Sequence, residues 1–122
     1  MTYILIFFLS TFPLGLSHGL EKSILSALSR GNGKEISKYF NSSVRISIHA
    51  DNRLATKFQA ELILVDYLNR NKLVDIKKST PNGDVGKNCV ILDAVSNKKK
   101  VRIFIKLVNL KGEDYISEFR ID

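Results

Sequence analysis

The residue types that most often perform acid–base or nucleophilic chemistry are scarce in this chain of 122 residues. It contains a single cysteine, Cys89, and two histidines, His18 and His49. A single cysteine excludes a disulfide framework and a cysteine-based metal cluster, and two histidines do not make up a multi-histidine metal site. We therefore expect no metal and no other cofactor.

The candidates for catalysis each have a simpler structural interpretation. Cys89 opens an apolar run, which predicts a buried and inert thiol rather than the exposed thiolate that nucleophilic catalysis requires. His49 falls on the polar phase of an alternating strand pattern and is predicted to point away from the core. Asp93 is predicted to lie at a solvated strand edge, and Asp66 on the exposed side of a helix. These residues form no convincing acid–base pair.

Positive charge is the feature of composition that best indicates a partner. The chain has 19 lysines and arginines against 12 acidic residues, a formal net charge of +7. Six basic residues lie in or beside neighbouring predicted strands: Lys77, Lys78, Lys98, Lys99, Lys100 and Arg102. Such a patch attracts phosphates, anionic lipid headgroups or acidic polysaccharide. The alternative is that these lysines form a solvated face or protect an edge strand from aggregation. Nucleic-acid binding is disfavoured, because no aromatic stacking residues lie beside them.

The first twenty residues carry no charge and contain the apolar run 4–9. An apolar segment of about 10–14 residues is too short to span a bilayer, and small residues follow it, as they do before a signal-peptide cleavage site. We therefore predict a secretory signal peptide over residues 1–19, a mature chain without a transmembrane segment, and a periplasmic or secreted location. The alternative is a buried or interfacial N-terminal helix.

Residues 20–122 have the length and composition of one globular domain. Apolar spacing predicts helices over 20–29, 33–40 and 57–68, the last of them opened by a capping box of Thr56 and Gln59. Alternation and turn signals predict strands over 44–48, 53–55, 73–80, 87–95, 100–110 and 115–121. Because strand 87–95 is apolar on both faces, it is predicted to lie centrally in an antiparallel sheet.

The helix over 57–68 has a wide apolar stripe, which is typical of a helix sandwiched against a sheet. We predict that Phe58, Leu62 and Val65 pack on the inner face of the sheet, opposite residues such as Ile103 and Ile105.

Three segments resemble one known family. They are GNGKEISKYFNSSV at 31–44, KFQAELILVDYL at 57–68 and YISEFRI at 115–121. They are similar to blocks of a family of small exported bacterial proteins of unknown function, mostly from the Bacteroidetes, with the nuclear-transport-factor-2-like or cystatin-like cone. The resemblance implies an α+β domain in which helices pack on a curved antiparallel sheet, in the order α-α-β-β-α-β-β-β-β. The resemblance identifies no catalytic or binding residues in this chain, because none is assigned in that family.

The cone implied by this resemblance holds a cavity that relatives use for isomerases, dehydratases or small-molecule binding. We expect a small-molecule site at the mouth of the cone, lined by Tyr39, Tyr67 and Phe104, with the two tyrosine hydroxyls in water. The alternative is that these side chains fill the cavity and leave no site.

Two classes of function follow from these observations. The favoured one is an exported non-catalytic module that binds a small molecule or a component of the cell envelope. The alternative is a cone-type lyase or isomerase acting on a small apolar substrate, which the missing acid–base pair disfavours. A cystatin-like protease inhibitor is rejected, because the glutamine-x-valine-x-glycine loop is absent. The sequence leaves open whether the protein is a homodimer.

Overall fold

The computed structural model describes residues 16–79 and 88–122, with side chains from Gly19 onward. The elements are α2 (Leu16–Ser29), α3 (Gly33–Ser37), β1 (Phe40–Ile48), β2 (Asp51–Thr56), α4 (Lys57–Arg70), β3 (Leu73–Lys78), β4 (Cys89–Ser96), β5 (Lys99–Leu110) and β6 (Glu113–Ile121). This order is the predicted one. The connection between the predicted strands 73–80 and 87–95 and most of the predicted leader lie outside the described residues. The predicted boundary between residues 19 and 20 falls within α2.

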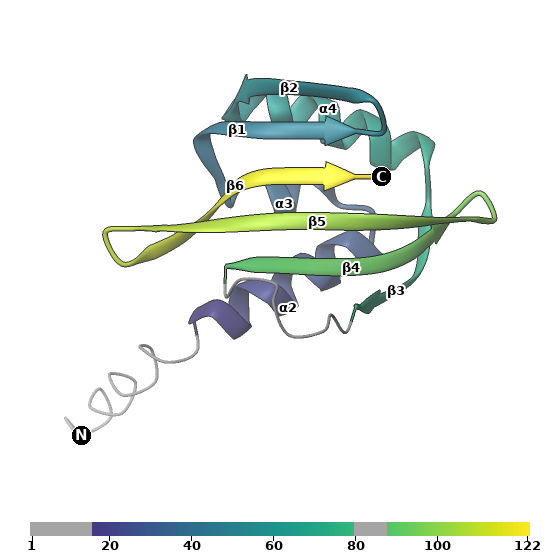
Figure 1. Ribbon diagram of the computed structural model, residues 1–122, viewed down its shortest axis with the longest axis horizontal. Helices are drawn as coiled ribbons and strands as arrows, with labels where there is room; N and C mark the ends of the chain where they lie inside the picture. The colour runs from purple at the N-terminus through teal and green to yellow at the C-terminus, as the bar shows by residue number, and fades with distance from the viewer. Residues whose placement is uncertain (1–15, 80–87) are drawn as a thin grey trace, which may run out of the picture.

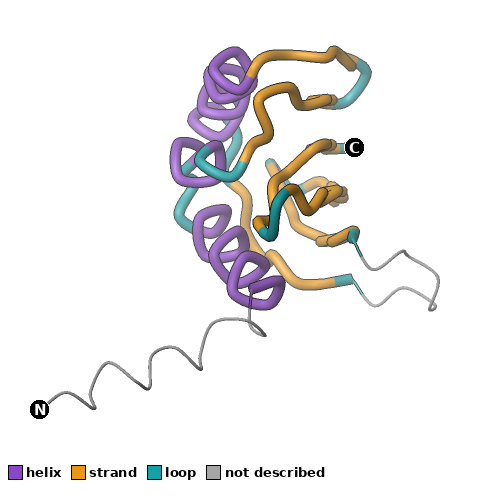
Figure 2. The backbone as a smooth tube through the Cα atoms, turned by 90° about the vertical axis from the view of Figure 1, so that its left-hand side faces the viewer, coloured by secondary structure: helices purple, strands orange, loops and turns teal. Residues whose placement is uncertain are grey.

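The strands form one curved sheet with the order β2-β1-β6-β5-β4-β3 (Figure 1). Neighbouring strands are antiparallel except β1 and β6, which run parallel. The three helices cover one face of the sheet and leave the other uncovered (Figure 2). We call the covered side the inner face and the other the outer face. The expected position of β4 at the centre was wrong, because it lies next to the edge strand β3.

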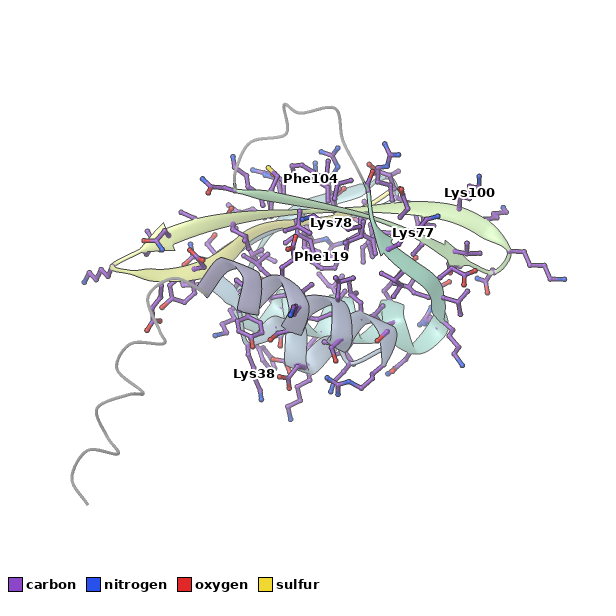
Figure 3. The ribbon with its side chains drawn as sticks, turned by 90° about the horizontal axis from the view of Figure 1, so that it is seen from below. Lys38, Lys77, Lys78, Lys100, Phe104 and Phe119 are labelled. Atoms are coloured by element: carbon purple, nitrogen blue, oxygen red, sulfur yellow. The ribbon has the colours of Figure 1, made fainter. Side chains whose placement is uncertain are left out.

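The core fills the space between the inner face and the helices. Ile103 and Ile105 are fully buried there, as expected, and Phe119 lies between the sheet and the helices (Figure 3). The rings of Phe40 and Phe119 meet edge to face with centroids 6.3 Å apart. This packing joins the parallel strands β1 and β6.

Local signals fix where the helices begin and end. Gly31 follows α2 with a φ of 66°, a left-handed conformation that glycine adopts without strain. The Asn32 side chain then caps α3 by accepting from the Glu35 backbone N–H at 3.0 Å. The predicted capping box of α4 is confirmed, since Thr56 and Gln59 exchange two hydrogen bonds of 3.1 Å.

The predicted inner face of α4 was wrong. Ala60, Leu64, Tyr67 and Leu68 are the buried residues of this helix. Phe58 and Leu62 are instead 65% and 53% exposed, and Val65 is half-buried. The helix has two apolar stripes, so its apolar spacing alone could not indicate which stripe faces the sheet.

The predicted burial of Cys89 was also wrong. Only alternate residues of β4 are buried, namely Val90, Leu92, Ala94 and Ser96. Cys89 lies on the outer face opposite Lys106 and is half-buried. A run that is apolar at every position cannot show which of its two faces the helices cover.

Candidate functional site

The structure does not bring together the three aromatic residues expected at one small-molecule site. Tyr39 directly precedes β1, whereas Tyr67 lies in the last turn of α4 beside His49, which follows β1. The nine residues of β1 separate these two positions by about 30 Å of extended chain. Phe104 lies on the outer face of the sheet (Figure 3). The three side chains therefore belong to three different surroundings.

Tyr39 lies at an opening between the helices and the sheet. A cavity of about 530 Å³ is bounded there by α2, the segment joining α3 to β1, and the β5–β6 hairpin. We call it the mouth cavity; its lining is Gly19, Leu20, Ser23, Lys38, Tyr39, Gly112, Glu113, Asp114 and Tyr115. The Ile116 N–H donates to the Tyr39 carbonyl at 2.6 Å, which fixes the hairpin against this segment.

The walls and rim of the mouth cavity differ in polarity. Leu20 is buried, and the rings of Tyr39 and Tyr115 are half-buried. Tyr115 donates its hydroxyl hydrogen to Glu113 Oε1 at 2.9 Å. This hydrogen bond, together with the negative charge of Glu113, raises the pKa of Tyr115 above its ordinary 10.0. The hydroxyl is therefore neutral at physiological pH.

Tyr67 lies in the core at the opposite end of β1. Its ring is 8% exposed, and its centroid is 6.1 Å from that of His49. Burial raises the pKa of Tyr67 above 10.0, against a smaller opposing effect of the Ser96 hydroxyl. His49 itself is exposed, as predicted from its phase in the strand.

Phe104 packs within the outer face. It lies opposite Ile91 of β4 and Arg120 of β6. The guanidinium carbon of Arg120 lies 5.3 Å from the centroid of the Phe104 ring, which is a cation–π contact. These neighbours make Phe104 part of the sheet surface rather than of the mouth cavity.

Three of the predicted basic residues line a second concave surface, of about 960 Å³, on the outer face. These are Lys77, Lys100 and Arg102. Three carboxylates line the same surface: Asp75, Asp93 and Asp122. Arg102 Nε lies 3.1 Å from Asp93 Oδ1. Opposite charges thus balance one another here, so this concavity offers no clear preference for an anion.

The other predicted basic residues point elsewhere. Lys78 Nζ lies 3.2 Å from Glu21 Oε2 of α2. Lys98 and Lys99 are exposed at the β4–β5 hairpin, where Asn97 and Lys98 adopt left-handed φ angles of 52° and 67°. The six residues form a dispersed basic end of the molecule, and a role for them in binding stays a prediction.

No acidic side chain in residues 19–79 and 88–122 is fully buried. The buried polar side chains of 19–79 and 88–122 are Ser37, Ser47 and Ser96. Asp93 is paired with Arg102, and the exposed Asp66 lies 3.1 Å from Arg70. In this part of the chain no carboxylate or imidazole is buried in an apolar environment that would tune it for acid–base catalysis.

The mouth cavity contains residues that the sequence did not single out together. Leu20 and Tyr115 are 95 positions apart, and the fold brings them to one opening. A connection between strands 100–110 and 115–121 was predicted, but which helix this hairpin would meet was not. No local pattern in the sequence encodes that contact, because it depends on how far β5 and β6 extend past the core.

The fold is that of the nuclear-transport-factor-2-like proteins. A protein described as NTF2-like from Cytophaga hutchinsonii superposes with a TM-score of 0.57 at 11% identity, over 84% of this chain and 91% of that one. Within the described residues, no helix is long and apolar enough to cross a membrane.

The family is shown by the sequence itself. Residues 21–122 match the family described as a domain of unknown function, DUF4783, and the chain belongs to that family. A family member from Bacteroides uniformis superposes with a TM-score of 0.73 at 19% identity, covering 83% of this chain and 94% of that one. One from Bacteroides ovatus gives 0.71 at 20% identity, covering 82% and 91%. No curated protein is significantly similar to this chain.

Proposed function

We propose that this protein is an exported, non-catalytic module that binds a small amphipathic molecule in the mouth cavity. The observation that carries the proposal is the lining of this cavity. Leu20, Tyr39 and Tyr115 supply apolar walls, and charged side chains lie at its rim. Small-molecule sites are commonly mostly apolar concavities of about 300–1,000 Å³ with a few polar groups that orient the ligand.

The rim indicates which chemistry a ligand needs. Lys38 carries a positive charge, and Glu113 and Asp114 carry negative ones. Asp114 Oδ1 already accepts from Asn109 Nδ2 at 2.8 Å, and Glu113 accepts from Tyr115. A ligand with an apolar body and a polar head would place the body against the rings and the head beside Lys38.

A lyase or isomerase is the less favoured alternative. Such an enzyme needs an acid or base whose pKa is shifted by an apolar environment and which faces the substrate. The acidic residues described at the mouth cavity lie at its rim, and Glu113 is exposed. Tyr115 has a pKa shifted upwards, which makes it a poorer acid.

Export is the second part of the proposal, and it rests on the uncharged apolar leader. Leu20 is 7% exposed and packs in the core, so we expect cleavage to retain it. Sequencing the N-terminus of the mature protein should give a start between His18 and Leu20. Recovery of the intact chain, beginning with Met1, from the soluble cytoplasmic fraction would contradict export.

Native mass spectrometry of the protein purified from its own cell envelope tests the binding proposal. We expect a small-molecule adduct that is lost in Tyr39→Ala, which shortens a wall of the mouth cavity. The matched control is Phe104→Ala, which removes an aromatic ring of similar exposure from the outer face and should keep the adduct. An adduct that survives Tyr39→Ala, or no adduct at all, would contradict binding at the mouth cavity.

A further inference from the structure

The two edges of the sheet are built differently. An edge strand presents unpaired backbone N–H and C=O groups, and proteins block such edges with lysines, bulges and short strands. The edge strand β3 carries Lys77 and Lys78. Its register with β4 shifts between Val74 and Lys77, where Asp75 adopts a φ of 53°. These features hinder the addition of another strand to β3.

The other edge strand, β2, has none of these features. Its register with β1 runs without interruption from Asp51 to Thr56. It contains neither lysine nor proline, and its residues all have negative φ. Within the part of the chain that the structure describes, no strand pairs with its outer side. The β2 edge is therefore open to a further strand.

Exposed apolar side chains gather beside this open edge. Leu54 of β2 is 63% exposed, and Phe58 and Leu62 of α4 are 65% and 53% exposed. Leu54 and Leu62 line one groove of about 440 Å³, and Phe58 lies one helical turn from Leu62. We call these three residues the β2 edge patch. Exposed leucine and phenylalanine beside an open edge indicate a surface that is covered in use.

We propose that a second copy of this chain covers the β2 edge patch, with β2 pairing antiparallel to the partner's β2 across a two-fold axis. The two six-stranded sheets then form one continuous sheet. The apolar stripe of Phe58 and Leu62 becomes buried, so that α4 packs on both of its apolar sides. The β2 edge patch shares no residue with the lining of the mouth cavity, so the proposal is independent of the proposed function.

A second copy is the occupant that the sequence of β2 favours, because β2 can pair with itself without opposing like charges. A two-fold axis places one residue of β2 opposite itself. Centring on Arg53 would put two like charges directly opposite each other, which destabilises a strand pair. Centring on Leu54 puts leucine against leucine and Arg53 opposite the partner's Ala55. Within β2 this register opposes no two like charges.

A disulfide tests this register. In a Cys89→Ser background, Leu54→Cys should form an intermolecular disulfide under mild oxidation, because directly opposed antiparallel residues have Cα atoms about 4.5–5.5 Å apart. The matched control is Val74→Cys in the same background, which is 43% exposed on the β3 edge and should remain mostly monomeric. Equal cross-linking at both positions, or none at Leu54→Cys, would overturn the proposed register.

Sedimentation equilibrium over a series of protein concentrations tests dimer formation without an introduced cysteine. The wild-type chain should approach twice its monomer mass, and Leu62→Lys should raise the dimer dissociation constant at least tenfold. The control Leu110→Lys, at a residue 42% exposed on the β5–β6 hairpin, should leave it unchanged. Because both residues are exposed, both variants should fold with unchanged circular dichroism. A wild-type chain that stays monomeric, or a dimer insensitive to Leu62→Lys, would refute the proposal.

Discussion

Gly33 and Val65 are in direct contact where α3 crosses α4. A Cβ atom added to Gly33 would lie 3.1 Å from both the Cα and the backbone N of Val65. These are backbone atoms of a helix and cannot rotate away as a flexible side chain would. The contact shows that Val65, expected in the sequence to face the sheet, faces α3 instead.

Gly33→Ala should therefore destabilise the protein, by about 1–3 kcal/mol, because α3 must move outward to make room for the methyl group. The measurement is the free energy of unfolding from urea denaturation. Lys34→Ala, at the exposed neighbouring position, should change it by less than about 0.5 kcal/mol. Equal effects of the two substitutions would show that the α3–α4 contact is looser than described.

Two leucines of α4 should respond differently to truncation. Leu64 is fully buried, so Leu64→Ala should cost about 2–5 kcal/mol of unfolding free energy. Leu62 is 53% exposed, and Leu62→Ala should cost less than about 1 kcal/mol. The melting temperatures of the two variants at low protein concentration measure the difference. A larger loss of stability for Leu62→Ala than for Leu64→Ala would show that Leu62 faces the sheet, as the sequence predicted.

Cys89 should react with a thiol reagent in the folded protein. It is half-buried at the start of β4, so its thiol should be labelled without unfolding. Cys89→Ser should change the unfolding free energy by less than about 1 kcal/mol, since a hydroxyl there can reach water. Mass spectrometry after brief labelling measures the reaction. Labelling only in denaturant would instead place Cys89 in the core.

The buried Tyr67 should make the protein less stable at alkaline pH. Burial raises the pKa of Tyr67 above 10.0 in the folded state, so the folded chain holds this proton more tightly than the unfolded chain. The resulting stabilisation is complete below pH 10 and is lost as the pH rises through the raised pKa. Tyr67→Phe should flatten the fall in melting temperature above pH 10. A fall as steep in Tyr67→Phe as in the wild type would show that Tyr67 does not contribute.

Much of the fold could be predicted because its signals are local. Turn residues, caps such as Thr56 and alternation such as that of Val101, Ile103 and Ile105 each depend on a few neighbouring residues. The order of these elements then resembled a known family, and the structure has that order. Two predictions of burial were wrong, one for a face of α4 and one for Cys89 of β4. In both elements two opposite faces are apolar. Local spacing shows that an element has an apolar face. When it has two, only tertiary packing decides which of them is buried in the core.

The candidate site was less predictable than the fold. Tyr39 was proposed and lies at the mouth cavity, but its neighbours Leu20 and Tyr115 come from the two ends of the domain. Phe104 was expected at the mouth of the cone, but it alternates with the buried Ile103 and Ile105 and therefore lies on the outer face. Its exposed side is covered by Arg120, a contact between strands that no sequence pattern indicates.

Mapping a bound probe by nuclear magnetic resonance tests directly whether the mouth cavity binds a small molecule. The probe is 8-anilino-1-naphthalenesulfonate, which has an apolar body and an anionic head, titrated into the uniformly ¹⁵N-labelled protein. We predict amide shifts concentrated at Lys38, Tyr39 and residues 112–115, and their loss in Tyr39→Ala. Shifts confined to the outer-face concavity at Lys77, Lys100 and Arg102, or to the β2 edge patch, would contradict a ligand site at the mouth cavity.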